Sequence, residues 1–467
     1  MSPQFTWLTL SQAQAALAAR LQDPNMVFWI ADELTRYLQE SLRTWNALTN
    51  QWIFDYDLSS LIELDQVWYP LQNIANYPRV RTVTDQELLI LMAYHLIEPQ
   101  GFGYGGFGYN FGFNWGIGAN TAGTGMFTVA DMAAALQRRR DEIIQLTACN
   151  VVELLVPGVP GVRQGVFPDT TLSPLRARWV PVSGSPNTLW RDDDLGLEYF
   201  STSYLQGQAG PGQSPGRQPK TYGVVNGPPL AFNLDFPPPL PGNFDFLIVK
   251  SQAVLNPPNA TVLGLPNDWC WVAKWGALSD LLGEESEATD PARADYCLQR
   301  YRDGITIMQK APWIFTGLLN GVPVDTVSVS EMDDYAQDWE DEPVATPCIV
   351  TGGMDFLAVS PVPTAGPLPG VALSVVGNAP VPVFNSDFVQ ISRDQFDVIL
   401  DYSAHLASFK MGGSDFTRSK ELAKNFFMAA LLTNSRLKQL GLFRDLLLEQ
   451  GQRQEEKDPR FVEEGDK

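Results

Sequence analysis

One stretch decides the fold of this chain: Leu230-Ala-Phe-Asn-Leu-Asp-Phe-Pro-Pro-Pro, followed by Phe244-Asp-Phe-Leu-Ile-Val-Lys. These apolar runs, separated by prolines, predict a pair of strands in a hairpin. A helix predicted over residues 268–282 carries apolar side chains on two faces, which indicates burial on two sides. A second helix begins with Asp290 as N-cap and Pro291 at its first helical position. Because a hairpin with two helices is too small to fold alone, other parts of the chain must cover it.

The same order of signals recurs later in the chain. Gly352-Gly353 stands where Asn226-Gly227 stands in the first copy, and each pair precedes a strand that ends in prolines, a Pro-Gly turn and a second strand. Both copies continue with two helices, and Tyr402-Ser-Ala aligns with Trp275-Gly-Ala in the first helix of each pair. The sequence therefore predicts a duplicated module. The alternative is that two unrelated hairpins share the ordinary signals of turns and caps.

Other helices are predicted from apolar spacing and from capping signals. Apolar residues recur at helical spacing from Ile30 to Leu48, which predicts a long N-terminal helix. A short acidic helix is predicted to begin at Trp190. Capping boxes mark four predicted helix starts: Ser11 with Gln14, Thr84 with Glu87, Thr128 with Asp131, and Ser392 with Gln395.

These elements predict an α+β fold, in which a helical bundle is combined with proline-punctuated β-hairpin regions. The hairpin followed by two helices is the duplicated unit. We predict four segments: an N-terminal helical region, 1–150, with a Gly/aromatic insert at 101–125; a β-rich segment with the first hairpin and helix pair, 151–320; the second copy, 321–450; and a charged, flexible C-terminal tail, 451–467.

The composition excludes several classes of function. The formal net charge is −21, from 53 acidic and 32 basic residues, whereas general nucleic-acid binding relies on Lys and Arg to neutralise phosphates. An acidic wall that repels DNA is compatible with this charge. The four cysteines lie far apart without a CxxC motif, which predicts buried free thiols. The N-terminus has no signal-peptide pattern and no segment reaches the roughly 18 apolar residues of a membrane span, so we expect no membrane association.

Motifs for catalysis and cofactor binding are scarce. With 2 histidines, the chain has little material for a histidine-built triad or metal centre. A GxGxxG pattern at Gly101, Gly103 and Gly106 follows a predicted helix, whereas a dinucleotide site needs a preceding strand. We therefore predict no catalytic residue, no cofactor and no metal.

The Gly/aromatic insert has the composition of an adaptable contact loop. Its glycines give it no single preferred backbone, and aromatic side chains such as Phe107, Tyr109 and Trp115 could order against a neighbouring subunit. The alternative is a loop that is merely flexible.

Two stretches carry a resemblance to a known family. The first is Leu17-x-x-Arg-Leu followed by Phe28-Trp-x-x-Asp-Glu-Leu-x-x-Tyr-Leu, and the second is the proline-punctuated hairpin followed by Leu265-Pro-Asn-Asp-Trp, a helix, and Asp290-Pro-Ala-Arg. With these stretches the chain resembles the head-to-tail connector proteins of tailed bacteriophages, the portal adaptors of the neck. The resemblance covers about residues 10–311, and the duplication and the Gly/aromatic insert depart from it.

The resemblance implies a structural virion protein of the neck or tail, assembled in the host cytoplasm and without enzymatic activity. Such proteins form a homo-oligomeric ring, expected here to be a dodecamer, between the portal protein and the tail or nozzle proteins. Double-stranded DNA passes through the ring without sequence-specific binding. A ring neighbour would then cover the apolar stripe Trp271, Trp275 and Leu282. The C-terminal segment would dock into the portal through Arg453, Glu455, Lys457, Arg460 and Phe461.

Two other functions remain open. One is another structural virion component, such as a tail, baseplate or host-attachment protein. The other is a carbohydrate-acting hydrolase that uses paired carboxylates, for which the run Asp192-Asp-Asp is the kind of sequence required.

Overall fold

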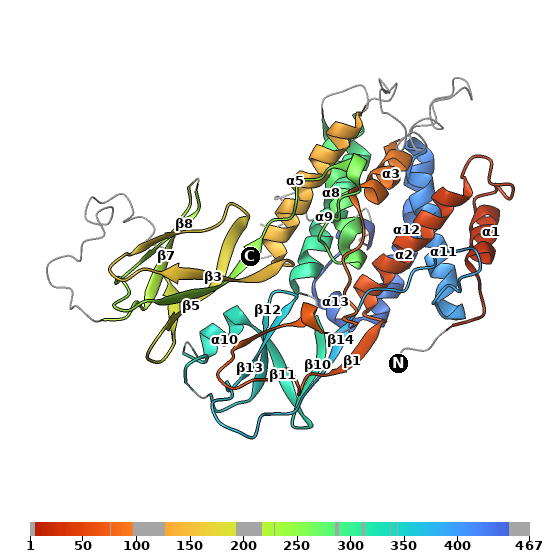
Figure 1. The fold of residues 1–467 in the computed structure, drawn as a ribbon. Helices are drawn as coiled ribbons and strands as arrows, with labels where there is room; N and C mark the ends of the chain where they lie inside the picture. Colours follow the sequence, from red (N-terminus) through yellow and green to blue (C-terminus); the bar gives the residue numbers. More distant parts are fainter. Residues whose placement is uncertain are drawn as a thin grey trace, which may run out of the picture.

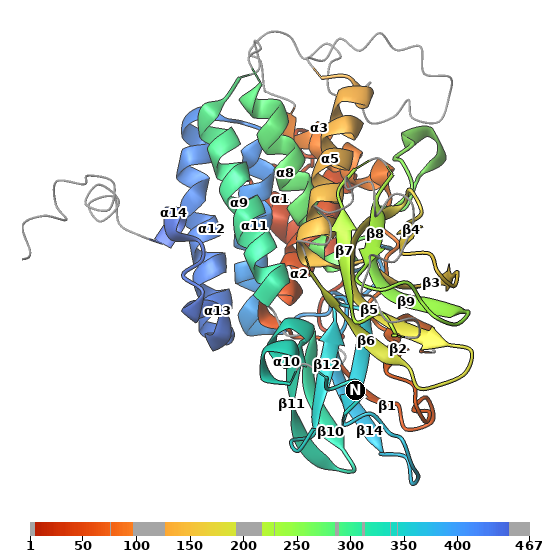
Figure 2. The same ribbon diagram turned by 90° about the vertical axis from the view of Figure 1, so that its left-hand side faces the viewer.

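The computed structural model describes residues 5–74, 76–96, 127–192, 217–227, 229–284, 289–310, 313–336, 338–342 and 344–447. Two seven-stranded sheets lie below and beside a layer of helices (Figure 1, Figure 2). The predicted contact residues of the insert and of the C-terminal tail lie outside the described residues: Phe107, Tyr109, Trp115, Arg453, Glu455, Lys457, Arg460 and Phe461.

The elements group into two modules, which we call module A and module B. Module A contains α1 (Leu10–Arg20), α2 (Ala31–Thr49), β1 (Ile53–Asp57), β2 (Trp68–Pro70), η1 (Leu71–Asn73), β10 (Ile314–Leu319), β11 (Val322–Ser328), α10 (Val329–Tyr335), β12 (Cys348–Gly352), β13 (Phe356–Ser360), β14 (Val371–Val376), α11 (Arg393–Phe409), α12 (Gly413–Thr433), α13 (Ser435–Gln439) and α14 (Arg444–Leu447). Module B contains α3 (Asp85–Leu96), α5 (Val129–Thr147), β3 (Val151–Gly158), β4 (Gln164–Val166), β5 (Thr171–Pro181), β6 (Asn187–Arg191), β7 (Thr221–Val225), β8 (Ala231–Leu234), β9 (Gly242–Lys250), η3 (Pro257–Asn259), η4 (Asn267–Trp269), α8 (Cys270–Gly283) and α9 (Pro291–Lys310).

The two modules have the same topology. The strand order is β1-β14-β10-β11-β12-β13-β2 in module A and β3-β9-β5-β6-β7-β8-β4 in module B, which match strand for strand. In each sheet one pair is parallel, β11 with β12 and β6 with β7, and the others are antiparallel. The helices match as well, because α2, α11 and α12 pack together as α5, α8 and α9 do. The predicted duplication is therefore confirmed, and it extends over more elements than the hairpin and helix pair.

Module B lies inside the sequence of module A, between β2 and β10. The second copy accordingly does not begin at residue 321, because the sheet of module A is completed by β1 and β2 from the N-terminal region. Likewise the predicted N-terminal helical region, 1–150, is divided between the modules. The boundaries were wrong because Ile53 of β1 pairs with Val376, 323 residues away, and Pro70 of β2 pairs with Phe356, 286 residues away. Local patterns carry no signal for such pairing.

The opening stretch forms two strands, but they are not a hairpin. β9 lies between β3 and β5, whereas β8 lies between β7 and β4. Pro237, Pro238 and Pro239 have no N–H groups to donate to a ladder, so the chain leaves β8 and crosses to the far side of the sheet. The tight hairpin is β7–β8, and its turn contains Asn226-Gly227 as predicted; β12–β13 is its counterpart.

Several predicted helix starts are corrected. The capping box of α1 is formed by Thr9 with Gln12, two residues before the predicted Ser11 with Gln14. Thr128 and Asp131 form the predicted box of α5, whereas the side chain of Ser392 makes no capping hydrogen bond to α11. The residues around Trp190 form β6 and no helix, because they pair with β5 and β7.

Four apolar cores hold the modules together. One lies within the helical layer, one on the inner face of each sheet, and one joins the two sheets. All four cysteines are buried free thiols, as predicted. No helix of the described part of the chain is long and apolar enough to span a membrane.

The stripe expected to face a ring neighbour is buried inside the chain. Trp271, Trp275 and Leu282 on α8 are 3%, 0% and 1% exposed. Trp275 stacks on His95 of α3 and meets the edge of Phe409 of α11. The prediction of burial on two sides was right, but module A covers the second side, so this stripe is not a lateral contact between chains.

The Trp275→Ala substitution tests this assignment. Removing a fully buried indole leaves a cavity between the modules, and we expect the free energy of unfolding to fall by about 3–5 kcal/mol. Phe384→Ala is the matched control, because Phe384 is 70% exposed and its loss should change stability by less than about 0.5 kcal/mol. Equal effects of the two substitutions in urea unfolding would contradict the assignment.

Candidate functional site

Charged side chains gather where module A meets module B. We describe a helix cluster, Glu40, His95 and Lys274, and a sheet cluster, Arg176, Arg178, Asp333, Glu340 and Asp341. In both clusters an ionic group of one module lies opposite a group of the other. The contact between modules is therefore the best-defined polar site in the described part of the chain.

The helix cluster is closed to solvent. Lys274 of α8 donates to Glu40 of α2 at 2.5 Å and lies 3.0 Å from Nε2 of His95. Burial raises the pKa of Glu40 and lowers that of Lys274, and the ion pair between them opposes both shifts. Burial also lowers the pKa of His95 well below its usual value, so its imidazole is neutral and Nε2 accepts from the ammonium. The helix cluster holds α3 and α8 of module B against α2.

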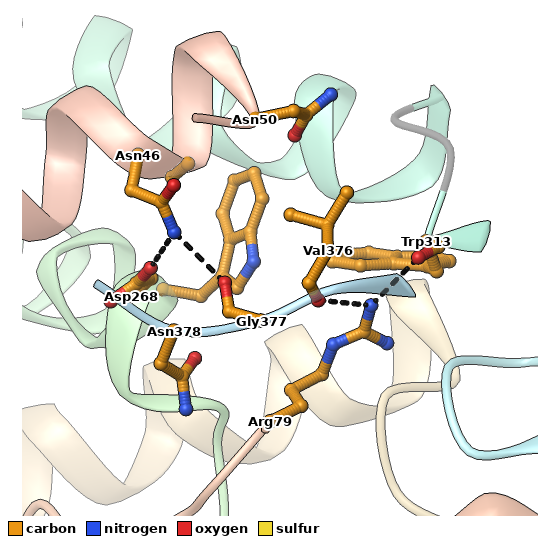
Figure 3. Close-up of a pocket in the computed structure, with 10 residues that line it drawn as sticks. Asn46, Asn50, Arg79, Asp268, Trp313, Val376, Gly377 and Asn378 are labelled. Atoms are coloured by element: carbon orange, nitrogen blue, oxygen red, sulfur yellow. Dashed lines mark hydrogen bonds between the residues drawn. The ribbon is translucent and has the colours of Figure 1, made fainter. Parts of the chain in front are cut away.

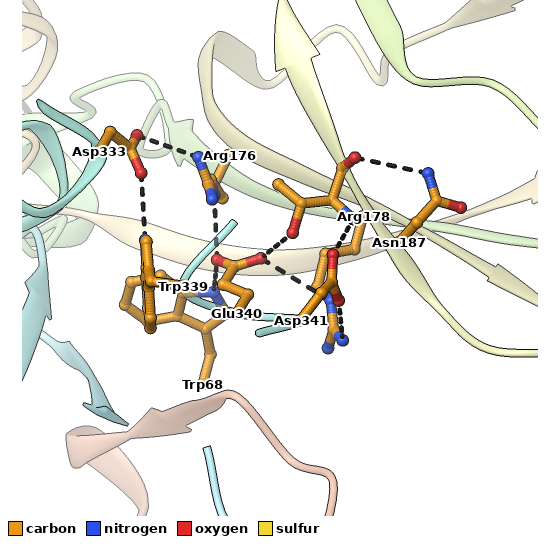
Figure 4. A network of polar contacts seen from close by, with 9 residues as sticks. Trp68, Arg176, Arg178, Asn187, Asp333, Trp339, Glu340 and Asp341 are labelled. Carbon is orange, nitrogen blue, oxygen red and sulfur yellow. Dashed lines mark hydrogen bonds and ion pairs between the residues drawn. The ribbon is translucent and has the colours of Figure 1, made fainter. Parts of the chain in front are cut away.

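The sheet cluster joins β5 to α10 and to the segment that follows it (Figure 4). The guanidinium of Arg176 donates to Glu340 and to Asp333, each at 3.0 Å, and Arg178 donates to Asp341 at 3.2 Å. The indole N–H of Trp68 on β2 donates to the same Glu340 carboxylate at 3.2 Å. Arg176 and Glu340 are buried. Removing one partner of such a pair strongly destabilises the folded protein, because the other charge stays buried without compensation. The sheet cluster therefore fixes the register of one sheet against the other.

A small cavity lies between α2, η4 and the end of β14 (Figure 3). Its volume of about 10 Å³ holds about one water molecule and no substrate. The amide of Asn46 donates to Asp268 and to the carbonyl of Gly377, and the guanidinium of Arg79 donates to the carbonyls of Trp313 and Val376. Here too the polar groups tie the two modules together.

An open depression of about 380 Å³ lies at the outer side of α5 and α8. It is lined by Arg138, Ser279, Asp280, Gly283 and Glu284. Asp280 binds Arg138 and Arg139. The depression is open and lined mainly by charged side chains, which suits contact with another surface better than the enclosure of a small ligand.

The buried sites differ from catalytic sites in access. The helix cluster and the Asp268 pair are buried without room for a substrate. Within the described ranges, no group of three His, Cys, Asp or Glu side chains could hold a metal ion. The arrangement is suited to positioning one module on the other.

The sequence patterns predicted neither of the two clusters as a site. One signal was present, because Lys274 lies between Trp271 and Trp275 in a helix that is apolar on two faces. A lysine in such a place must find a buried anion. The partner, Glu40, is far away in the sequence, and nothing local identifies it.

Comparisons with known proteins add no assignment. No known family model matches the chain, and no curated protein matches it either. The functional argument therefore rests on the sequence, with the resemblance it carries, and on the fold and its contacts.

The ion pair of the helix cluster gives one prediction. Lys274→Met leaves the Glu40 carboxylate buried without its cation, and we expect a loss of about 3–5 kcal/mol in unfolding free energy. Combining Lys274→Met with Glu40→Leu should recover most of that loss, because no uncompensated charge remains. Chemical denaturation of both variants provides the measurement, and a double variant no more stable than the single one would refute it.

Asp268 gives a prediction on pH. Its carboxylate accepts from Asn46 at 2.6 Å and from the Ala379 N–H at 2.8 Å, and burial nevertheless raises its pKa to about 7. Since the unfolded chain releases this proton near pH 4, the folded state binds more protons between about pH 4 and pH 7, and stability falls as pH rises through that range.

Asp268→Asn removes this titration while keeping an acceptor for both donors. We expect the variant to gain up to about 4 kcal/mol relative to the unchanged protein between pH 4 and pH 8. Urea unfolding of both proteins at several pH values measures the difference, which must grow with pH. A difference that is the same at pH 5 and pH 8 would show that Asp268 does not hold the proton.

Proposed function

We propose that the chain is a structural virion protein of a tailed bacteriophage that forms a ring at the head-tail junction, around the DNA channel. In this function it is an adaptor between the portal protein and the tail or nozzle proteins, and it has no catalytic activity. One observation carries the proposal: the two modules are packed head to tail, with different surfaces in contact.

The sheets demonstrate the head-to-tail contact. Module A contributes β2, β12 and β13, through side chains such as Trp68, Val350 and Phe356, and module B contributes β3 and β9, through Val151 and Leu247. The strands that match β2, β12 and β13 are β4, β7 and β8, and these lie away from module A. Each module therefore uses one side for the contact and leaves its opposite side for another partner.

The helical layer repeats this asymmetry. Helix α3 of module B packs against α2 and α11 of module A. Its counterpart α1 lies at the far end of module A, and α5 lies at the opposite end of the helical layer (Figure 1). A contact between unlike surfaces generates a ring when its rotation closes and an open helix when it does not.

Charge supports the proposed place around DNA. With a net charge of −21 the chain repels phosphates, so DNA can slide past without being held. The resemblance of residues 10–311 to portal adaptors supports the same place in the virion. The C-terminal residues 451–467 would supply the docking segment for the portal.

Direct imaging tests the proposal. The full chain is purified and examined by negative-stain electron microscopy and native mass measurement, alone and mixed with the portal protein of the same phage. We expect rings with a central opening wide enough for double-stranded DNA, on their own or stacked on the portal. A chain that stays monomeric with the portal present, at every concentration tried, would refute the proposal.

A further inference from the structure

We propose that neighbouring chains associate through α1 of one chain and the α5–α8 face of the next, with Asp401 of one paired to Arg138 of the other. This contact between chains has the same arrangement as the contact of α3 with α2 and α11 inside each chain. If the ring has the twelve positions that the resemblance implies, six chains with two modules each would fill them, in place of the twelve chains expected from the sequence. The inference rests on the proposed ring, and its residues can be tested separately from it.

Matching positions in the two modules are defined by the helices and strands. Both α2 and α5 have 19 residues, and Glu40 and Arg138 are each the tenth residue of their helix. Val376 is the strand partner of the first residue of β1, and Val249 is the strand partner of the first residue of β3. Counting the same number of residues forward from each valine leads to Asp401 on α11 and to Lys274 on α8, which matches these two residues. Thr9 before α1 forms a β-bridge to the loop before α11, and Thr84 before α3 forms the same bridge to the loop before α8. Counting from these two threonines matches Arg20 of α1 with His95 of α3.

Burial differs at matched positions in the way the proposal requires. On α3, Leu91, Tyr94 and His95 are buried, because this helix lies between the modules. On α1 the matching Ala16 is half-buried, and the matching Ala19 and Arg20 are exposed. The side of α1 that corresponds to the module contact of α3 is therefore uncovered within one chain.

The α5–α8 face, at the opposite end of the helical layer, also has an uncovered surface. Glu40 of α2 is 4% exposed because Lys274 of module B covers it, whereas the matching side chain of Arg138 on α5 is 61% exposed. Asp32 of α2 accepts from Tyr94 of α3, and the position on α5 that matches Asp32 is the exposed Ala130. The open depression beside Arg138 lies on this same face.

The charges at the two contacts are complementary and opposite in sign. Inside the chain, Lys274 is bound by Glu40 on one side and His95 on the other. In module A, Asp401 stands in place of Lys274 and is already bound by Arg20 of α1, which stands in place of His95. Arg138 of the next chain then takes the place of Glu40. In this contact the cation Arg138 binds the anion Asp401, whereas inside the chain the anion Glu40 binds the cation Lys274.

Arg138 can exchange its partner inside the chain for this contact. It pairs with Asp280 at 2.8 Å, but Asp280 is also held by Arg139 and stays neutralised when Arg138 turns away. The small side chains of Ala16 and Ala19 allow α1 to approach the α5–α8 face closely. A second copy of this chain thus fits both uncovered surfaces.

Charge reversal tests the pairing. Arg138→Glu should raise the concentration needed for half-assembly at least about tenfold, because it places two carboxylates together. Adding Arg20→Glu and Asp401→Arg to the same chain reverses all three groups and should restore assembly. The control is Arg418→Glu on α12, whose side chain is 83% exposed and whose change should leave assembly as it was. Assembly unaffected by Arg138→Glu would overturn the pairing.

Cross-linking tests the surface and the number of chains. A chain with Ala19→Cys and Ala130→Cys is assembled and treated with a short bismaleimide; the four native cysteines are buried and should not react. We expect a ladder of linked chains that ends at six, and no ladder from either single cysteine variant. A ladder ending at twelve would overturn the stoichiometry. Rings in the micrographs without any ladder would overturn the interface and leave the proposed ring in place, whereas absence of rings would remove the proposed function itself.

Discussion

The structure depends on the second apolar face of α8. One face packs within module B, and the other, which contains Trp275, packs against Phe409 of module A, with His95 of α3 stacked on the same indole. Exposing such a face would place a large apolar patch in water, which soluble proteins rarely do. Neither module can therefore bury its own helices alone, and the chain folds as a pair.

The buried ions make that pair specific. Apolar surfaces such as those around Trp275 tolerate small shifts, whereas the ion pair of Lys274 with Glu40 does not, because any shift leaves a charge buried without its partner. The sheet cluster acts in the same way between β5 and the segment after α10, through Arg176 and Glu340. Both clusters are placed at the boundary of the modules, where the geometry of a repeating assembly would be set.

Sequence patterns were sufficient for what is local and insufficient for what is distant. The Asn226-Gly227 turn, the Thr128 cap and the two-sided apolar α8 were predicted, and so was the duplication, because turn and cap signals repeat in order. The pairing of β1 with β14 and the separation of β8 from β9 were not predicted, since strand neighbours far apart in sequence leave no periodicity. The two clusters were not predicted for the same reason. Lys274 could be noticed as a lysine in an apolar helix, but its partner Glu40 can be identified only from the three-dimensional structure.

Because the chain contains two modules with different charges, the charges can select which module meets which. A chain with one module could not make this distinction. If one module A met another module A, Glu40 would lie opposite Asp401, and if one module B met another, Arg138 would lie opposite Lys274. Both arrangements bring like charges together, and such contacts cost several kcal/mol. Only alternation of the modules pairs Glu40 with Lys274 and Arg138 with Asp401. The reversed signs would thus exclude wrong neighbours, and the covalent link would keep half of the contacts formed before any chains meet.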